Sequence, residues 1–387
     1  MPETTAYIVA ARRSALGRVG GLHRGRRIDA LAAPVVVAAL QDAGIAAAEV
    51  EDLVLGNATE GGNPARLIAL AAGLSEAVAA TTIDRQCGSS LEAIIAAHRA
   101  IALGDCEIAV AGGAESLSTA PWRIMRPRTL YQTPHFMRYE PAMTDAADEP
   151  QPFEASETLA HALGISRQEQ DEWAFATHAN AARAREERSF VGEIVPLRAN
   201  AEEARDESAA APDLDDISES VPFAPDGGTL TPANTSAMHD GAAFAVMVSE
   251  AVWQRLGQPP ALRLLRTVSV GARPTEEAAA PITAARKLFE RLNGSLHAGE
   301  IGVVELSESS AAQAIAFARS LKLDPARINP AGGAIVRGHP FGASGAVLVA
   351  RLYTDMVRRS GDNPTRFGLA GQGAIGGLGV AVLFERV

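Results

Sequence analysis

The feature that most constrains the fold of this chain is an alternation of short apolar runs with longer Ala-rich segments. Each apolar run is only a few residues long and is followed by a segment of helical length. Short apolar runs between helical segments are typical of parallel strands that helices cover on both faces. The alternation occurs twice, and 387 residues are enough for two hydrophobic cores. The sequence therefore predicts an α/β fold built from two similar halves.

The predicted elements form two groups. In the first group we expect strands at 6–10, 52–55, 80–84 and 107–111, and helices at 29–42, 64–72 and 89–103. In the second group strands and helices alternate over 242–249, 261–271, 281–293, 303–306, 310–321, 342–359, 366–370 and 379–384. Between the groups, residues 118–231 contain Pro-rich, basic, aromatic and acidic stretches and one strong helical pattern at 167–187. This middle region is predicted to be a loop-rich insertion.

Composition excludes several classes of protein. With 47% hydrophobic and 21% charged residues, the chain is globular rather than disordered, collagen-like or coiled-coil. The net charge of −11 argues against a nucleic-acid partner, and no apolar stretch of about 18 residues lacks a charge, so no membrane span is expected. The start of the chain has no secretory signal pattern. Two cysteines provide neither a disulfide framework nor a zinc site, so we expect no metal and a cytoplasmic location.

Charge is unevenly distributed within the middle region. Residues 202–219 hold eight acidic residues against the single Arg205, and the simplest interpretation is a solvated loop. Residues 121–138 hold four arginines and no acidic residue: Arg123, Arg126, Arg128 and Arg138. A local basic stretch suits a phosphorylated small molecule, although an ordinary solvated loop explains the charge equally well.

The most informative motif is DRQCGSSLEA at 84–93. A predicted strand ends at Asp84, a tight turn holds Cys87, and a predicted helix begins near Ser89. Unpaired N–H groups and the helix dipole favour a thiolate at such a position and can stabilise a developing oxyanion. The alternative is a buried, inert thiol, as expected for Cys106. The strand–turn–helix context favours Cys87 as a nucleophile.

A second motif lies in the glycine-rich segment 328–346. Gly332, Gly333, Gly338 and Gly342 surround His339, which precedes a proline that fixes the backbone. An imidazole held in this way is a candidate base for the Cys87 proton. A phosphate-cradling loop or a merely tight glycine loop are the alternatives, and no Gly-Lys-Ser/Thr is present that would indicate a Walker motif.

With these motifs the chain resembles the thiolases, that is, the acetyl-CoA acetyltransferases and 3-ketoacyl-CoA thiolases. The similar segments are GGNPAR (61–66), DRQCGSSLEA (84–93), GGAESLS (112–118), NTSAMHDGAA (234–243), ELSESSAAQA (305–314) and GGAIVRGHPFGASGA (332–346). The resemblance implies a duplicated thiolase fold, layered αβαβα with two mixed sheets, plus a loop domain. It places the N-terminal half at 1–117 and 232–250, the loop domain at 118–231 and the C-terminal half at 251–387.

The resemblance also implies roles for individual residues. Cys87 would be acylated by a coenzyme A (CoA) thioester and His339 would activate it. Ser236 would contact the pantetheine arm of CoA, and the basic stretch 121–138 would receive the CoA phosphates. CoA thioesters would be substrates, with no permanently bound cofactor, in fatty acid metabolism. The family also implies self-association as a dimer or tetramer.

The chain departs from the family pattern at several positions. Gly373 stands where thiolases carry a second reactive cysteine. The family's Asn-Glu-Ala-Phe motif begins here with Ser307 and Glu308, so these two residues and Gly373 are candidate supports of the site. Pro152 stands where the family has a pocket methionine, and VPFA at 221–224 replaces its Arg-Pro-x-Phe. These changes affect the C–C bond step, the acyl pocket and the adenine contacts.

Three functions are compatible with this pattern. The first is a thiolase-family acyltransferase that works through acyl-Cys87, with a modified C–C step. The second keeps acylation of Cys87 but passes the acyl group to an amine, an alcohol, a thiol or water. The third is a non-enzymatic CoA-binding relative, and the intact DRQCGSS and GHP motifs argue against it.

Overall fold

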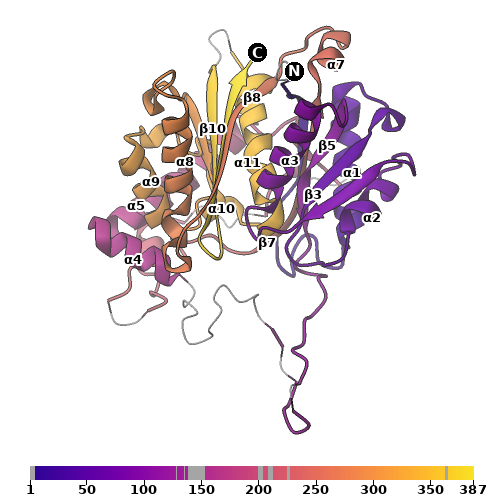
Figure 1. The fold of residues 1–387 in the computed structure, drawn as a ribbon. Helices are drawn as coiled ribbons and strands as arrows, with labels where there is room; N and C mark the ends of the chain where they lie inside the picture. The colour runs from indigo at the N-terminus through magenta and orange to yellow at the C-terminus, as the bar shows by residue number, and fades with distance from the viewer. Residues whose placement is uncertain are drawn as a thin grey trace.

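The computed structural model describes residues 5–127, 129–134, 136–137, 153–198, 204–207, 212–224, 227–361 and 365–387. Its strands follow one path in the order β4-β3-β5-β7-β1-β8-β11-β10-β9 (Figure 1). Their bounds are β1 (Tyr7–Ser14), β3 (Asp52–Gly56), β4 (Ala79–Ile83), β5 (Ile108–Glu115), β7 (His239–Val248), β8 (Leu262–Gly271), β9 (Val303–Leu306), β10 (Phe367–Ala374) and β11 (Leu378–Arg386). All strands predicted from the sequence are present, with shifted ends. Two short strands were not predicted: β2 (Gly17–Arg18) pairs with β7, and β6 (Ile194–Val195) pairs with β1.

The path consists of two mixed sheets, one from each half of the chain. In the first, β3 lies parallel to β4 and β5, while β7 is antiparallel to β5 and β1. In the second, β11 is antiparallel to β8 and β10, and β9 is parallel to β10. The sheets meet where β1 and β8 pair at only two positions, Tyr7 with Arg263 and Ile8 with Leu262. The two predicted sheets are therefore joined through this short pairing.

Helices cover the sheets in layers. The bounds are α1 (Ile28–Ala43), α2 (Pro64–Ala71), α3 (Ser89–Leu103), α7 (Glu250–Arg255), α8 (Ala280–Arg291), α9 (Ala311–Leu321), α10 (Ala334–Arg337) and α11 (Ser344–Tyr353). One core cluster joins α3 and α11 to the inner faces of both sheets. A second places α1 and α2 on the outer face of the first sheet, and a third places α8 and α9 on the outer face of the second (Figure 1). The layers therefore run αβαβα, with α3 and α11 in the middle.

Strand β11 shows how the sequence produces this layering. Val380, Val382 and Phe384 belong to the central core, whereas Ala381 and Leu383 belong to the outer core under α8 and α9. Successive side chains of a strand point to opposite faces, so a strand covered on both faces must be apolar throughout. This requirement explains why the strands are short continuous apolar runs.

The middle region contains more regular structure than the sequence predicted. The predicted helix is present as α5 (Arg167–Glu186), which Ser166 caps by accepting the backbone N–H of Glu169. Two further helices, α4 (Glu154–Leu163) and α6 (Leu214–Ser218), were not predicted. Helix α4 packs against α9, and α5 packs against α9 and α10. The middle region therefore rests on the C-terminal half of the chain.

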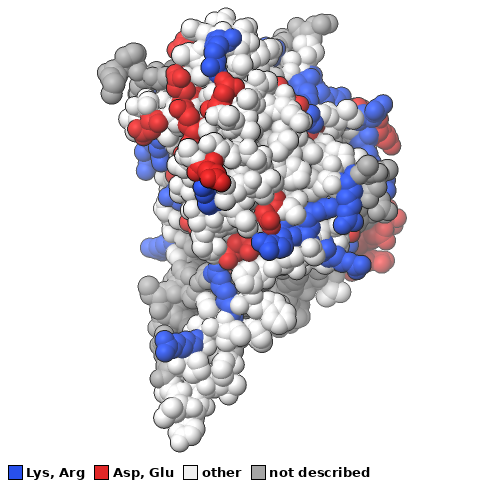
Figure 2. All heavy atoms as spheres, turned by 90° about the vertical axis from the view of Figure 1, so that its right-hand side faces the viewer, with Lys and Arg blue, Asp and Glu red and all other residues white. Residues whose placement is uncertain are grey.

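A projecting arm, made of the described residues 117–127, 129–134 and 136–137, leaves the body of the molecule (Figure 1). Ile124 and Phe136 form an antiparallel bridge, and the Trp122 ring packs edge-on against Phe136 with 5.4 Å between centroids. Leu130 and Tyr131 are each 97% exposed. On the face that Figure 2 shows, the described part of the arm is mostly uncharged. Among the described helices, none has the length and hydropathy needed to cross a bilayer.

A network of buried charges connects the middle region to both halves. Arg13 of β1 forms salt bridges with Glu193 at 2.6 Å and with Asp206 at 2.5 Å. Arg351 of α11 forms a further salt bridge with Glu193. Burial opposes ionisation of Glu193, but the guanidinium groups of Arg351 and Arg13 outweigh it and lower its pKa to about 2. The prediction that 202–219 is simply a solvated loop is therefore wrong at Asp206, because this carboxylate neutralises a buried arginine.

We expect Glu193→Gln to lower the free energy of unfolding by about 3–5 kcal/mol, because it leaves two buried arginines without this counter-charge. Urea unfolding followed by circular dichroism measures the change. The control is Glu172→Gln on the exposed face of α5, for which a change within about 0.5 kcal/mol is expected. Equal stability of both variants would contradict this role of Glu193.

Candidate active site

Cys87 lies in the turn between β4 and α3, as the sequence predicted. It is 7% exposed, and the preceding residue, Gln86, has a positive φ of 51°. The Ser89 hydroxyl fixes the turn: it accepts the N–H of Arg85 at 2.8 Å and donates to the carbonyl of Gln86 at 2.5 Å. Residues other than glycine whose surroundings hold the backbone at a positive φ cluster at functional sites.

The thiol of Cys87 is held in its protonated form. Burial and then the negative charge of Glu277 raise its pKa to about 12, while the N–H of Ile375, which hydrogen-bonds the sulfur, opposes the rise. The position at a helix N-terminus therefore does not by itself produce a thiolate. A base next to Cys87 is needed to take its proton.

His339 is held by backbone and side-chain hydrogen bonds. Its backbone N–H donates to the carbonyl of Ala237 at 2.8 Å, and its backbone carbonyl accepts the backbone N–H of His239 at 3.2 Å. Its Nδ1 lies 2.7 Å from the Ser344 hydroxyl. Burial, and to a lesser extent His239, lower the pKa of His339 to about 4. The imidazole is therefore neutral at pH 7, which is the state that can accept a proton.

The loops that carry Cys87 and His339 meet because the helices that follow them, α3 and α11, begin side by side. The hydroxyl of Ser90 in α3 accepts the N–H of Ala346 in α11 at 2.9 Å. A Cβ on Gly113 at the end of β5 would lie 2.5 Å from the carbonyl oxygen of Gly342 and 2.6 Å from the Ser90 side chain. Only glycine allows so close an approach of backbone to backbone.

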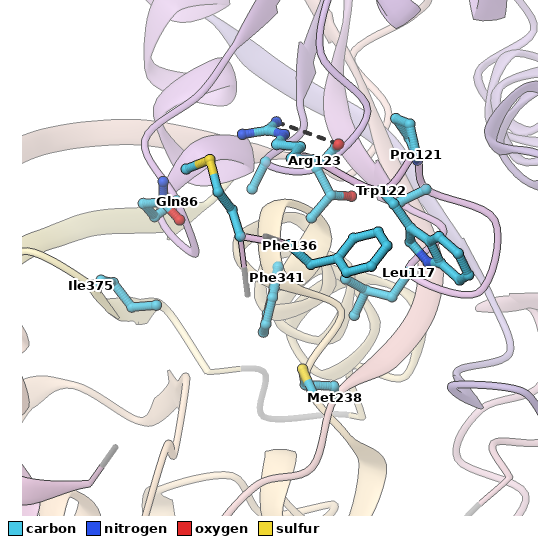
Figure 3. Close-up of a pocket in the computed structure, with 13 residues that line it drawn as sticks. Gln86, Leu117, Pro121, Trp122, Arg123, Phe136, Met238, Phe341 and Ile375 are labelled. Atoms are coloured by element: carbon cyan, nitrogen blue, oxygen red, sulfur yellow. Dashed lines mark hydrogen bonds between the residues drawn. The ribbon is translucent and has the colours of Figure 1, made fainter. Parts of the chain in front are cut away.

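One cavity of about 620 Å³ lies beside both loops (Figure 3). Gln86 and Ile375 line it next to Cys87, while Met238 and Phe341 line it next to His339. The arm supplies a further wall, made of Leu117, Ala120, Pro121, Trp122, Arg123, Phe136 and Met137. A largely apolar cavity of this size with a few polar groups is typical of a small-molecule site.

Ser307 and Gly373, two of the candidate supports, lie together. The Ser307 hydroxyl accepts the N–H of Gly373 at 3.2 Å, and the Ser307 N–H donates to the carbonyl of Gly371 at 2.9 Å. Ser307 and His339 also line a second cavity of about 10 Å³. This volume is close to what one water molecule needs.

Glu308, the third candidate support, faces away from this cluster. Its carboxylate accepts the indole N–H of Trp173 at 2.8 Å and the backbone N–H of Ile335 at 3.2 Å. The Thr177 hydroxyl also donates to this carboxylate, at 3.4 Å. Glu308 thus joins α5 to α10, just before His339, and its oxygens are occupied there.

Ser236 lies in a segment that runs between the turn at Ser309 and the His339 loop. Its N–H donates to the Ser309 carbonyl at 3.0 Å, and its side chain is half-buried. Two residues further on, Met238 bridges to His339 and lines the large cavity. The structure therefore brings Ser236 close to the other predicted residues.

Sequence reasoning assigned no catalytic role to three titratable residues near the site, and took His239 for a strand-edge substitution. Glu115 is fully buried, and its carboxylate accepts the N–H groups of Ala58 and Gly342; burial raises its pKa to about 7. The His239 ring lies against Gly338, where a Cβ would be 2.1 Å from it. Glu277 acts on Cys87, as described above. The one sequence feature that pointed to Glu277 was the acidic pair at 276–277, shortly before a predicted helix.

Other predictions concern residues away from these loops. Arg128, Arg138 and Pro152 lie outside the described residues, whereas Arg123 lines the cavity and its guanidinium is 3.4 Å from the Thr59 carbonyl. Phe223 of the VPFA segment stacks on Phe153 with 4.7 Å between centroids. In the part of the chain that the structure describes, no group of His, Cys, Asp and Glu side chains could hold a metal ion.

Comparison with known proteins narrows the class of enzyme. Residues 6–251 match the family described as thiolase, N-terminal domain, and residues 258–386 match thiolase, C-terminal domain. The chain is 35% identical to the acetyl-CoA acetyltransferase of Shinella zoogloeoides, with 99% of each chain covered. It is 34% identical to the protein of that name from Pseudomonas aeruginosa, with 98% of each covered. The crystal structure of the Bacillus anthracis acetyl-CoA acetyltransferase has a TM-score of 0.90 at 31% identity, covering 100% of this chain and 99% of that one.

The layered fold and its matches define an acyltransferase. The chain belongs to the thiolase family. The predicted duplicated thiolase fold is confirmed, both by the αβαβα layers and by the structural match over the whole chain.

We expect Cys87 to react slowly with iodoacetamide at neutral pH, because its pKa is raised to about 12. In the Cys106→Ala variant, which keeps Cys87 as the only thiol, the alkylation rate should still increase well above about pH 8.5, the ordinary pKa of a cysteine. Intact-mass spectrometry at a series of pH values measures this rate. A plateau near or below the ordinary value would show that the raised pKa is wrong.

Proposed function

We propose that the protein transfers acyl groups from CoA thioesters through a covalent thioester on Cys87, with His339 as the base. The observation that carries this proposal is that a protonated thiol and a neutral imidazole lie on two loops that border the same apolar cavity, ahead of two helices that contact each other. A thiol that keeps its proton needs a base in order to become a nucleophile, and a neutral histidine is the usual one.

The first step of the proposed reaction is acylation of Cys87. Cys87 gives its proton to Nε2 of His339, and the sulfur attacks the thioester carbon of acyl-CoA. The new S–C bond forms, the bond from carbon to the CoA sulfur breaks, and the CoA thiolate leaves with the electron pair. In this scheme Nδ1 of His339 carries hydrogen and donates to Ser344, which leaves Nε2 as the acceptor.

Backbone N–H groups are suited to stabilise the oxyanion of the tetrahedral intermediate. The N–H of Ile375 and that of Cys87 itself both act on the thiol. Preorganised donors of this kind are worth about 2.7–4 kcal/mol each in other acyl-transfer enzymes. A water in the small cavity between Ser307 and His339 would add a further donor.

The large cavity supports CoA thioesters as the substrate class. Ser236 beside the Met238 wall is our candidate contact for the pantetheine arm, and Arg123 at the rim is our candidate for a CoA phosphate. We propose no permanently bound cofactor. The relatives are named acetyl-CoA acetyltransferases, which supports acetyl or another short acyl group and a role in fatty acid metabolism.

Two candidate functions differ in the group that accepts the acyl group from Cys87. Formation or cleavage of a C–C bond needs an acid/base for the proton α to a thioester, and Gly373 provides no such group. The second candidate is therefore transfer of the acyl group from Cys87 to another nucleophile or to water. The names of the relatives favour the first candidate, and the glycine at 373 favours the second.

We further propose that the protein self-associates as a dimer or tetramer through its projecting arm. Exposed apolar side chains gathered on one projecting element are typical of protein–protein contacts. Leu130 and Tyr131 at the tip, together with Trp122 and Phe136, provide such a surface. An assembly of this kind would also cover the arm wall of the cavity.

We also propose a cytoplasmic location and a division of the chain into three parts. Two free cysteines suit the reducing cytoplasm. The division into 1–117 with 232–250, 118–231 and 251–387 follows the resemblance. The packing of α4 and α5 on the C-terminal half supports treating the middle region as a separate unit laid across that half.

Incubation with acetyl-CoA and butyryl-CoA should add the mass of one acyl group to the protein. Cys106→Ala should be acylated like the wild type, because Cys106 lies just before β5 and outside the turn between β4 and α3. Cys87→Ala should stay unmodified. Intact-mass spectrometry detects the product, and wild-type protein that stays unmodified by a panel of acyl-CoA thioesters would refute the proposed nucleophile or donor.

The double substitution Leu130→Ser and Tyr131→Ser should reduce the molecular mass measured by light scattering coupled to size-exclusion chromatography. It removes two large apolar side chains from the arm's tip. The matched control is Leu103→Ser, which removes an exposed leucine (68%) at the end of α3. A wild type that is monomeric, or a double variant with unchanged mass, would contradict the role of the arm.

A further inference from the structure

The position of the missing cysteine is surrounded by three other elements. A Cβ built on Gly373 would lie 3.1 Å from Nε2 of Gln313, 3.3 Å from Cδ of Pro281 and 3.6 Å from the carbonyl oxygen of Glu277. Glu277, which contributes its backbone oxygen here, is the member of this set with an ionisable side chain.

The short 3₁₀ helix η4 (Pro274–Ala279) carries Glu277 and is packed along the hairpin of β10 and β11. At its start, the N–H of Ala272 donates to the carbonyl of Gly377 at 2.7 Å. Just past its end, a Cβ on Gly379 would lie 2.2 Å from the carbonyl of Ala280. The same hairpin supplies the Ile375 N–H to the Cys87 sulfur. One rigid hairpin thus connects Glu277, Gly373 and the nucleophile.

The negative charge of Glu277 also acts on the Cys87 thiol. Among the charges that act on the Cys87 thiol, that of Glu277 has the largest effect and exceeds that of the buried Glu115. Glu277 is itself only partly buried. Proton exchange with water is what an acid/base needs between turnovers.

The neighbouring polar side chains are already committed elsewhere. The Gln313 amide donates to the carbonyl of Ala278 at 3.3 Å and accepts the N–H of Ser309 at 3.1 Å, and it has no acid/base function near pH 7. The oxygens of Glu308 hold Trp173 and Ile335. Glu308 is therefore no substitute for the missing cysteine.

We propose that Glu277 is the acid/base that replaces the missing second cysteine and takes the α-proton of a CoA thioester bound next to acylated Cys87. This inference rests on the proposed function, because it requires an acyl group on Cys87. It also names the acceptor, which is the α-carbon of a second thioester.

The step balances with the groups that are present. The Glu277 carboxylate removes the α-proton of the second thioester, and the electron pair of that C–H bond becomes the enolate. The enolate carbon attacks the acyl carbon on Cys87, so that a C–C bond forms and the bond from carbon to the Cys87 sulfur breaks. The thiolate that leaves takes the proton from Glu277, and both groups return to their starting states. Cleavage of a 3-ketoacyl thioester is the reverse of this sequence.

The test compares Glu277→Gln with the wild type in two measurements. The first is acylation of Cys87 by acetyl-CoA, followed by intact mass. The second is incorporation of deuterium from D₂O into the methyl group of acetyl-CoA, which reports removal of the α-proton and needs no net condensation. Glu276→Gln, a change at the exposed neighbour, is the matched control, and Glu277→Asp is the conservative variant.

We expect Glu277→Gln to keep Cys87 acylation and to slow deuterium incorporation by roughly 10²–10⁴-fold, the usual contribution of a positioned acid/base. The same substitution should lower the apparent pKa for alkylation of Cys87, because a negative charge beside the thiol is removed. Glu277→Asp should recover part of the exchange rate. Thiolysis of acetoacetyl-CoA should follow the same order of variants.

Other outcomes would overturn the proposal in distinguishable ways. If wild-type Cys87 is never acylated, the proposed function fails, and the role of Glu277 fails with it. If acylation occurs but Glu277→Gln exchanges deuterium as fast as the wild type, only the role of Glu277 fails. Loss of acylation in Glu277→Gln would also count against it, because it would indicate a structural role or a role in the first step.

Discussion

The close approach of two helix N-termini in the central layer is the constraint on which the rest of the structure depends. Helices α3 and α11 come from different halves of the chain, yet a Cβ on Gly345 of α11 would lie 2.6 Å from the Leu91 side chain of α3. Small residues at this contact let the loops ahead of both helices border one cavity. Cys87 lies on one loop and His339 on the other. The duplicated architecture is therefore what brings together two residues that are 252 positions apart in the sequence.

Burial determines the chemical state of the groups at this contact. The low-polarity surroundings keep the Cys87 thiol protonated and the His339 imidazole neutral, since each loses solvation on becoming charged. The two side chains are thus both uncharged at rest, and in the proposed mechanism charge separates only when a thioester arrives to receive the sulfur's electrons. The nearby carboxylate of Glu277 reinforces this state. A site of this kind limits side reactions of a free thiolate, at the cost of requiring a well-placed base.

The sequence predicted those features that depend on local pattern. The spacing of apolar residues and the turn and capping residues between them were enough to predict the strands, the helices α3 and α5, and the position of Cys87 at the start of a helix. Helix α4 was missed because its buried side is formed by small residues such as Ala155, Ser156 and Ala160, which give no apolar stripe. Asp206 was misjudged and Glu277 overlooked for a different reason: the partner of each lies 190 or more residues away, and no local pattern encodes that distance.

A buried hydrogen bond between two charged side chains sets the spacing of the remaining site residues. Arg337 of α10 donates to Glu305 of β9 at 3.0 Å, and each lies two residues before a member of the site, His339 and Ser307 respectively. Buried pairs of this kind add little net stability, because desolvation offsets most of their attraction. Their geometry is specific, however, and here it fixes the distance across the small cavity that Ser307 and His339 share. The role of this pair is therefore best understood as positioning: it links the segment that carries His339 to the strand that leads to Ser307, the two residues that line the small cavity.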